Sequence, residues 1–176
     1  RQALQAGIRC FNVESAAELE RLNAVAGELG KRAPIALRVN PDVDPKTHPY
    51  ISTGLKGNKF GVAFADAPAL YRRAAQLPNL HVSGVACHIG SQLLDPAPMA
   101  EAAHKLRGLV EQLAAEGIAL DHIDLGGGLG IRYSDETPPA VATYLAPLLA
   151  VFADREEELC FEPGRSLVGN AGLLLT

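Results

Sequence analysis

The sequence contains no tryptophan and only three cysteines among its 176 residues. The thiols of Cys10, Cys87 and Cys160 are odd in number and each lies in an apolar stretch, so they do not suggest a disulfide framework. We expect them to be buried and reduced, as is typical of cytoplasmic proteins. No Cys/His spacing resembles that of a zinc site, and we therefore expect no metal.

Also missing are a long apolar run and an excess of basic residues. No segment approaches the roughly 20 apolar residues that cross a membrane, and a formal net charge of −4 argues against a nucleic-acid partner. The start, Arg1-Gln2-Ala3-Leu4, lacks both an initiator methionine and the pattern of a signal peptide. We expect a soluble, cytoplasmic piece of a longer polypeptide, with no membrane partner and with one sizeable core.

Strand-like and helix-like segments alternate along the chain. Apolar, β-rich runs predict strands over residues 7–13, 34–40, 81–88, 120–125 and 158–162. Apolar residues at helical spacing predict helices over 16–29, 66–76, 98–116 and 138–152, and a last apolar run covers 167–176. Ser15 and Glu18 have the spacing of a capping box. Repeated β-then-α units with continuous apolar strands predict a parallel sheet covered by helices, an α/β fold.

Polar residues gather just past the ends of the predicted strands. Asn40, His88, the glycines 126–128 and the run 162–165 all occupy such positions. In a (β/α)8 barrel these ends converge on one face and build a single site. About five repeats are visible where a barrel needs about eight. We therefore predict part of a (β/α)8 barrel, truncated at both ends, rather than a doubly wound sheet.

Two of these loops carry the chemistry of an anion site. Gly126, Gly127 and Gly128 have no side chains, so their backbone amides can converge on a phosphate, although a tight turn that allows close packing also explains them. Glu162 and Arg165 flank a Pro-Gly turn with fixed charges, or they form an ordinary surface ion pair. A site for a phosphate, a cationic ring nitrogen and a carboxylate fits pyridoxal phosphate (PLP) with an amino-acid substrate.

Other candidates carry a weaker signal. His88 ends a strand, where a histidine is either a hydrogen-bonded packing residue or a functional one. Ser91, three residues later, either begins a loop or contributes its hydroxyl to the site. The loop 41–62, which contains His48, is far longer than an ordinary βα connection, and loops of that length are usually functional or disordered.

Six runs, taken together and in order, resemble a known family over essentially the whole chain. They are 39–44 (VNPDVD), 47–54 (THPYISTG), 58–61 (NKFG), 87–92 (CHIGSQ), 124–130 (DLGGGLG) and 162–165 (EPGR). The family is that of the diaminopimelate decarboxylases, which belong to the PLP-dependent decarboxylases with an alanine-racemase-like fold. The glycine and EPGR runs are shared with ornithine and arginine decarboxylases, whereas the long loop and the CHIGSQ run point to the diaminopimelate branch.

The resemblance implies how the cofactor is held. The amides of the glycines 126–128 would bind the PLP phosphate, together with the Ser91 hydroxyl and the backbone at Gly164 and Arg165. His88 would stack on the cofactor ring, and Glu162 would pair with the pyridine nitrogen, which makes the ring an electron sink. 

The same resemblance implies a substrate contact. The Arg165 guanidinium would clamp a substrate carboxylate, for which its planar fork is suited. Arg38, at the end of a strand, is a weaker candidate for supporting the ring or its phenolic oxygen.

The chain also departs from the family pattern. In the family a Tyr-x-x-Lys-type motif upstream of this segment supplies the Schiff-base lysine, and nothing here matches it. Lys31, Lys46, Lys56, Lys59 and Lys105 all fall in predicted loops or helices. The Cys-Glu-Ser element and the late tyrosine of the C-terminal β domain are absent too. We expect the chain to be the central and C-terminal part of the barrel domain, without catalytic residues of its own and inactive alone.

The implied activity belongs to the full-length parent, a homodimer with shared active sites. It is the decarboxylation of meso-2,6-diaminopimelate to L-lysine. Alternatives are a decarboxylase of the same fold acting on ornithine, arginine or carboxynorspermidine, and a catalytically inert regulatory homologue. A barrel that binds another phosphorylated ligand through the glycines alone is a further alternative.

Overall fold

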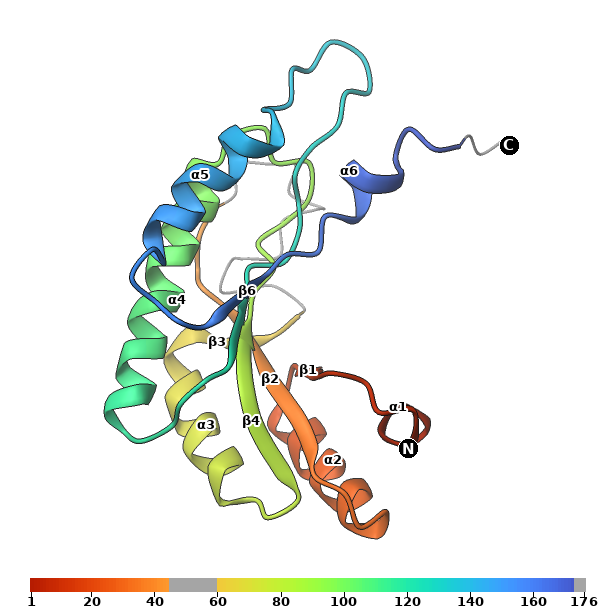
Figure 1. The fold of residues 1–176 in the computed structure, drawn as a ribbon, viewed down its shortest axis with the longest axis vertical. Coiled ribbons are helices and arrows are strands. Elements are labelled where there is room, and N and C mark those ends of the chain that lie inside the picture. Colours follow the sequence, from red (N-terminus) through yellow and green to blue (C-terminus); the bar gives the residue numbers. More distant parts are fainter. Residues whose placement is uncertain (45–59, 173–176) are drawn as a thin grey trace.

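The computed structural model describes residues 1–44 and 60–172, and these form one curved parallel sheet with helices packed on it (Figure 1). The sheet order is β1-β2-β4-β5-β6, and β3 pairs with the end of β2. The strands are β1 (Phe11–Val13), β2 (Ala33–Asn40), β3 (Val62–Ala63), β4 (Leu80–Ala86), β5 (His122–Asp124) and β6 (Glu158–Cys160). The helices are α1 (Gln2–Ala6), α2 (Ala16–Glu28), η1 (Phe64–Asp66), α3 (Ala67–Gln76), α4 (Ala97–Ala115), α5 (Val141–Val151) and α6 (Gly164–Val168). The predicted α/β alternation is confirmed.

A capping interaction begins α2, as the sequence predicts. The Ser15 hydroxyl accepts a hydrogen bond from the Glu18 amide at 3.2 Å, which satisfies one of the free amides of the first turn. The reciprocal bond is displaced by one residue, because the Glu18 carboxylate accepts from the amide of Glu14 at 2.7 Å. The cap therefore also fixes the backbone of Glu14, immediately after β1.

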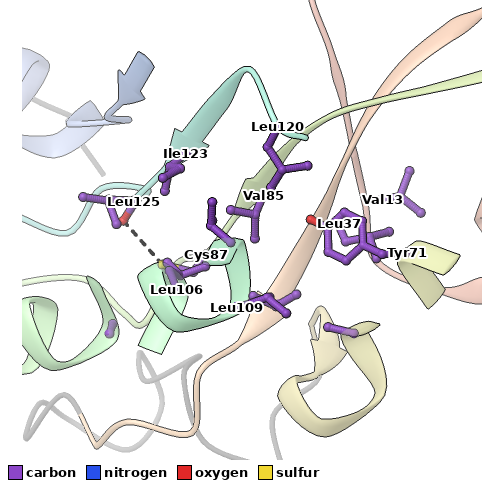
Figure 2. Close-up of a cluster of buried hydrophobic side chains, with 14 of the residues drawn as sticks. Val13, Leu37, Tyr71, Val85, Cys87, Leu106, Leu109, Leu120, Ile123 and Leu125 are labelled. Carbon is purple, nitrogen blue, oxygen red and sulfur yellow. Dashed lines mark hydrogen bonds between the residues drawn. The ribbon is translucent and has the colours of Figure 1, made fainter. Parts of the chain in front are cut away.

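The core lies between the sheet and the helices (Figure 2). Val13, Leu37, Val85 and Ile123, one from each of four neighbouring strands, are fully buried on this face. Tyr71 of α3 is also fully buried, and its hydroxyl donates to the Gly84 carbonyl at 2.8 Å, so its polar atom has a partner inside the core. Large apolar residues thus occupy the helix-facing side of each strand and leave the concave side to small residues, such as Ala86, and polar ones.

The sheet curves as a barrel segment does. Four strand spacings of about 4.8 Å would place β1 and β6 about 19 Å apart in a flat sheet, too far for one ion pair to bridge. Yet the Arg9 guanidinium, just before β1, donates to the Glu158 carboxylate at the start of β6 at 3.0 Å. The two edges must therefore bend toward each other, which confirms the predicted partial barrel.

Four short elements were not predicted, namely α1, β3, η1 and α6. Of the last apolar run, 167–176, the first two residues end α6, where Leu167 and Val168 are exposed at 73% and 66%, and residues 173–176 lie outside the description. The bounds of the other predicted elements differ from those of the structure by at most four residues, the largest shift being the start of β1. Across residues 1–44 and 60–172, no helix has the length and apolarity needed to cross a membrane.

Candidate functional site at the carboxyl ends of the strands

The carboxyl ends of the parallel strands surround a pocket of about 190 Å³. Its lining residues come from loops or strand ends of β1, β2, β4 and β6 and are Asn12, Glu14, Arg38, Ala86, Cys87, His88 and Glu162. Two residues predicted from the sequence, His88 and Glu162, thus share one pocket. The glycine run adjoins it, because the Gly127 amide donates to His88 Nδ1 at 3.3 Å.

The three glycines are required by close backbone packing. A Cβ atom on Gly126 would lie 2.3 Å from the Cys87 carbonyl oxygen, and one on Gly127 would lie 2.0 Å from that of Glu162. One on Gly128 would lie 2.4 Å from the Gly90 carbonyl oxygen. Gly126 and Gly128 also have positive φ values of 70° and 117°. Close packing therefore explains the three glycines. The glycine backbone lies directly against the chain at the ends of both neighbouring strands, β4 and β6.

Asp124 joins the glycine run to Glu162. Its Oδ1 accepts from the Gly126 amide at 2.8 Å, and its carboxyl group is near enough to that of Glu162 to raise the pKa of Glu162. Burial raises the pKa of Glu162, and the charge and hydrogen bond of Asp124 raise it further, while Arg38 opposes the shift. Asp124 belongs to the run 124–130, but the sequence patterns did not predict it as a site residue. An acidic residue that ends an apolar strand just before three glycines could have indicated this role.

Arg38 enters the same pocket from β2. Its Nη1 donates to the Glu14 carboxylate at 2.9 Å, and its guanidinium lies 5.3 Å from the centre of the Phe60 ring. Its Nε is buried and, within the described part of the chain, has no hydrogen-bond partner. A buried donor without an acceptor is costly in a folded protein, and a bound group with an acceptor oxygen would satisfy it.

His88 presents a neutral ring. Burial lowers the pKa of the imidazole, the Arg38 charge lowers it further, and Asp124 partly opposes this. Because Nδ1 accepts from the Gly127 amide, the proton of the neutral ring sits on Nε2. A half-buried neutral imidazole is suited to stacking on a flat aromatic group.

Arg165 contacts two neighbouring loops and does not form the simple ion pair with Glu162 that the sequence allowed. Among the described residues its recorded contacts are Gln92, whose Oε1 accepts from Nη1 at 3.3 Å, and the Tyr133 ring, 5.8 Å from the guanidinium. Gly164 begins α6 with open space around it, and Ser91 is half-buried in the loop after β4. 

The remaining candidates lie away from the pocket or outside the description. Lys31 donates to the Leu4 carbonyl and Lys105, on α4, donates to that of Asp42, so neither reaches the pocket. Lys46, Lys56, Lys59 and His48 lie outside the described residues. No group of three or more His, Cys, Asp or Glu side chains within 1–44 and 60–172 is arranged to hold a metal ion.

Comparison with known proteins agrees with this geometry. Residues 1–169 match the family described as pyridoxal-dependent decarboxylase, pyridoxal binding domain. The chain is similar to diaminopimelate decarboxylase from Pseudomonas aeruginosa, with 58% identity over 176 residues, which is 100% of this chain and 42% of the relative. With the enzyme of Neisseria meningitidis serogroup A, identity is 59% over 174 residues, 99% of this chain and 43% of the relative.

A solved structure gives the same result. Diaminopimelate decarboxylase from Helicobacter pylori, complexed with L-lysine, superposes with a TM-score of 0.91 and 42% identity over 94% of this chain and 42% of that one. The chain therefore spans about 42% of the length of such relatives. The sequence-based resemblance is confirmed, and the chain belongs to the pyridoxal-dependent decarboxylase family, within the pyridoxal-binding domain, and is similar along its whole length to diaminopimelate decarboxylases.

Proposed function

We propose that the full-length protein is a PLP-dependent decarboxylase that converts meso-diaminopimelate to L-lysine. The observation that carries this proposal is the single pocket at the carboxyl ends of the strands, where Glu162, His88 and the buried Nε of Arg38 meet beside the glycine run. Curated diaminopimelate decarboxylases align with the chain from end to end. The Helicobacter relative was solved with L-lysine, the product proposed here.

The residues present fit the phosphate of PLP. The glycine run and the start of α6 at Gly164 and Arg165 supply backbone amides. Those of Gly126, Gly127 and Gly164 donate to Asp124 Oδ1, His88 Nδ1 and the Glu162 carbonyl, and they would exchange these partners for phosphate oxygens. Ser91 adds a hydroxyl from the loop after β4. We propose that these groups together hold the phosphate, a function for which backbone amides are well suited.

The residues around the pocket fit the ring. When bound, PLP supplies an electron sink for the charge left as CO₂ departs. His88 stacks on the ring with its neutral imidazole, and the Arg38 Nε donates to an acceptor oxygen on it. Glu162 holds a proton at the pyridine nitrogen, because a cationic partner favours the ionised carboxylate and reverses the raised pKa that burial and Asp124 impose.

Arg165 binds a carboxylate of the substrate. Its planar guanidinium forms two parallel hydrogen bonds with a carboxylate, which a lysine cannot do. Among residues 1–44 and 60–172 its partners are the neutral amide of Gln92 and the Tyr133 ring, and neither neutralises its charge.

Other parts of the full-length protein complete the site. We propose that the Schiff-base lysine and the Cys-Glu-Ser element come from outside these 176 residues, since Lys31 and Lys105 contact carbonyls remote from the pocket. We further propose a cytoplasmic homodimer with shared sites. The free thiols of Cys10, Cys87 and Cys160 support the compartment.

The test is CO₂ release by the full-length, PLP-loaded protein from meso-diaminopimelate, ornithine, arginine and lysine. Selective turnover of diaminopimelate is the expected result. Turnover of ornithine or arginine would overturn the substrate while keeping the site. No turnover by PLP-bound protein would favour the inert regulatory homologue, and failure to bind PLP would overturn the cofactor.

A further inference from the structure

Gln92 is held in an unusual and well-defined position in the loop after β4. Its φ is +58°, a left-handed conformation that few residues other than glycine adopt. Its side-chain amide forms two hydrogen bonds with one residue of the loop after β5: Nε2 donates to the Ile131 carbonyl at 2.6 Å, and the Ile131 amide donates to Oε1 at 3.1 Å. The side chain thus pairs with backbone as a strand would.

This pairing fixes which way the amide faces. The Ile131 carbonyl can only accept and the Ile131 amide can only donate, so Nε2 of Gln92 must face the carbonyl and Oε1 must face the amide. A carbonyl oxygen has two lone pairs, and the second accepts from Arg165 Nη1 at 3.3 Å. Gln92 therefore presents a fixed acceptor to the guanidinium.

The surrounding backbone makes this contact rigid. The Leu93 amide donates to the Gly128 carbonyl at 2.8 Å, and the Gly130 amide donates to the Leu93 carbonyl at 3.0 Å. These bonds continue the Gln92–Ile131 pairing between the same two loops. The Tyr133 ring, two residues beyond Ile131, lies 5.8 Å from the Arg165 guanidinium. Two loops, those after β4 and β5, thus meet on one arginine.

We propose that Gln92 is a positioning residue for substrate selection, which orients the Arg165 guanidinium toward the substrate carboxylate. This inference rests on the proposed function, in which Arg165 binds that carboxylate. A neutral amide suits the task because it directs the arginine without neutralising it, whereas a glutamate at position 92 would form an ion pair with Arg165 and compete with the substrate.

The test measures ligand selectivity in the full-length holoenzyme. L-Lysine carries a carboxylate and cadaverine is the same diamine without it. The ratio of their dissociation constants therefore measures how strongly Arg165 binds the carboxylate. We expect Gln92→Leu to raise the dissociation constant of L-lysine by about tenfold, the usual scale for one hydrogen bond to a charged group. Cadaverine affinity should stay the same, and KM for meso-diaminopimelate should rise with little change in kcat. 

Gln92→Glu provides the charge test, because it keeps the acceptor while adding a negative charge. We expect it to lower the affinity for L-lysine more than Gln92→Leu does, and to leave the affinity for cadaverine unchanged. Gln112→Glu, at an exposed glutamine of α4, is the matched control and should change neither ligand. A purely structural role for Gln92 would weaken both ligands alike, and that result would overturn the inference.

Arg165→Met separates this inference from the proposed function. If Arg165→Met lowers the selectivity for L-lysine but neither Gln92 variant does, the positioning role is wrong and the clamp stands. If Arg165→Met leaves the selectivity unchanged, the clamp itself is wrong. Where Gln92→Leu fails to fold, Gln92→Glu alone decides, since its added charge acts on L-lysine only if Arg165 is the partner.

Discussion

At the scale of single residues, Asp124 links two parts of the predicted site, although the sequence patterns did not single it out. It accepts from the first glycine amide and raises the pKa of Glu162. Asp124 is buried, so its charge acts on Glu162 with little screening by water. The phosphate loop and the ring-nitrogen partner are therefore coupled through one side chain.

Asp124→Asn tests this coupling. The amide keeps an acceptor for the Gly126 backbone but removes the negative charge, so the pKa of Glu162 should fall toward its ordinary value. Carboxyl NMR titration of the cofactor-free, full-length protein measures it. Asp121→Asn, at an exposed position, is the control. A Glu162 pKa that stays the same in Asp124→Asn would contradict the coupling.

Glu162→Ala tests the electron-sink role. Losing the partner of the pyridine nitrogen should lower kcat by roughly 100-fold or more, the scale of other lost electrostatic contacts in active sites. Affinity for PLP should change far less, because the phosphate groups are untouched. Steady-state kinetics and cofactor titration measure the two effects, and near-normal turnover would remove Glu162 from this role.

At the scale of elements, close packing against neighbouring backbone explains the glycine run after β5. Its loop passes so close to the ends of β4 and β6 that a methyl group would overlap a carbonyl oxygen at each of the three positions. The sequence alone suggested an anion site or a tight turn, and the structure adds the steric reason for three consecutive glycines.

Gly127→Ala should disturb the site from within. Its Cβ would lie 2.0 Å from a backbone oxygen of Glu162, which cannot move without shifting the end of β6. We expect a loss of about 1–3 kcal/mol in unfolding free energy, the usual cost of overpacking, together with weaker PLP binding. Urea unfolding and cofactor titration of the full-length protein provide the measurements.

Gly108→Ala is the matched control for this substitution. Gly108 lies on the exposed face of α4 with nothing near the added methyl group, so alanine should stabilise the helix by about 0.5–1 kcal/mol. If Gly127→Ala behaves like Gly108→Ala, the close packing of the glycine loop is wrong.

The sequence predicted the long elements better than the short ones. Residues 34–40 and 97–115 carry continuous apolar or helix-periodic patterns, which report burial directly. In contrast, β3 has two residues and exists only through pairing with the end of β2. Side-chain pairings between distant loops, such as Gln92 with Arg165, depend on the tertiary fold and leave no periodic signal.

At the scale of the whole molecule, the curved sheet places apolar residues outward, under the helices, and polar residues on its concave side. His122 of β5 is buried there, with its ring packed against the Cα of Gly84. Burial lowers the pKa of His122, and the nearby charge of Arg9 lowers it further. His88 shows the same direction of shift at the other end of the sheet.

These shifts predict a pH dependence of stability. Above the unfolded pKa of about 6.5 both histidines are neutral in either state and contribute nothing. As the pH falls below that value, the unfolded chain binds protons that the folded chain does not, so stability falls until the folded pKa values are reached. Urea midpoints between pH 8 and pH 5 should therefore decline.

His122→Gln isolates one contribution to this decline. The variant has no imidazole at position 122, so its urea midpoint should fall less steeply between pH 7 and pH 5 than that of the unchanged protein. His104→Gln, at an exposed position of α4, should leave the slope unaltered. Parallel curves for His122→Gln and the unchanged protein would contradict the shifted pKa.

The most direct test of the account is a crystal structure of the full-length protein grown with PLP. We predict density for the cofactor at the carboxyl ends of the strands, with its ring against His88, its pyridine nitrogen beside Glu162 and its phosphate at the glycine run 126–128. Cofactor density elsewhere in the protein, or an ordered pocket with PLP bound to none of these residues, would contradict the account.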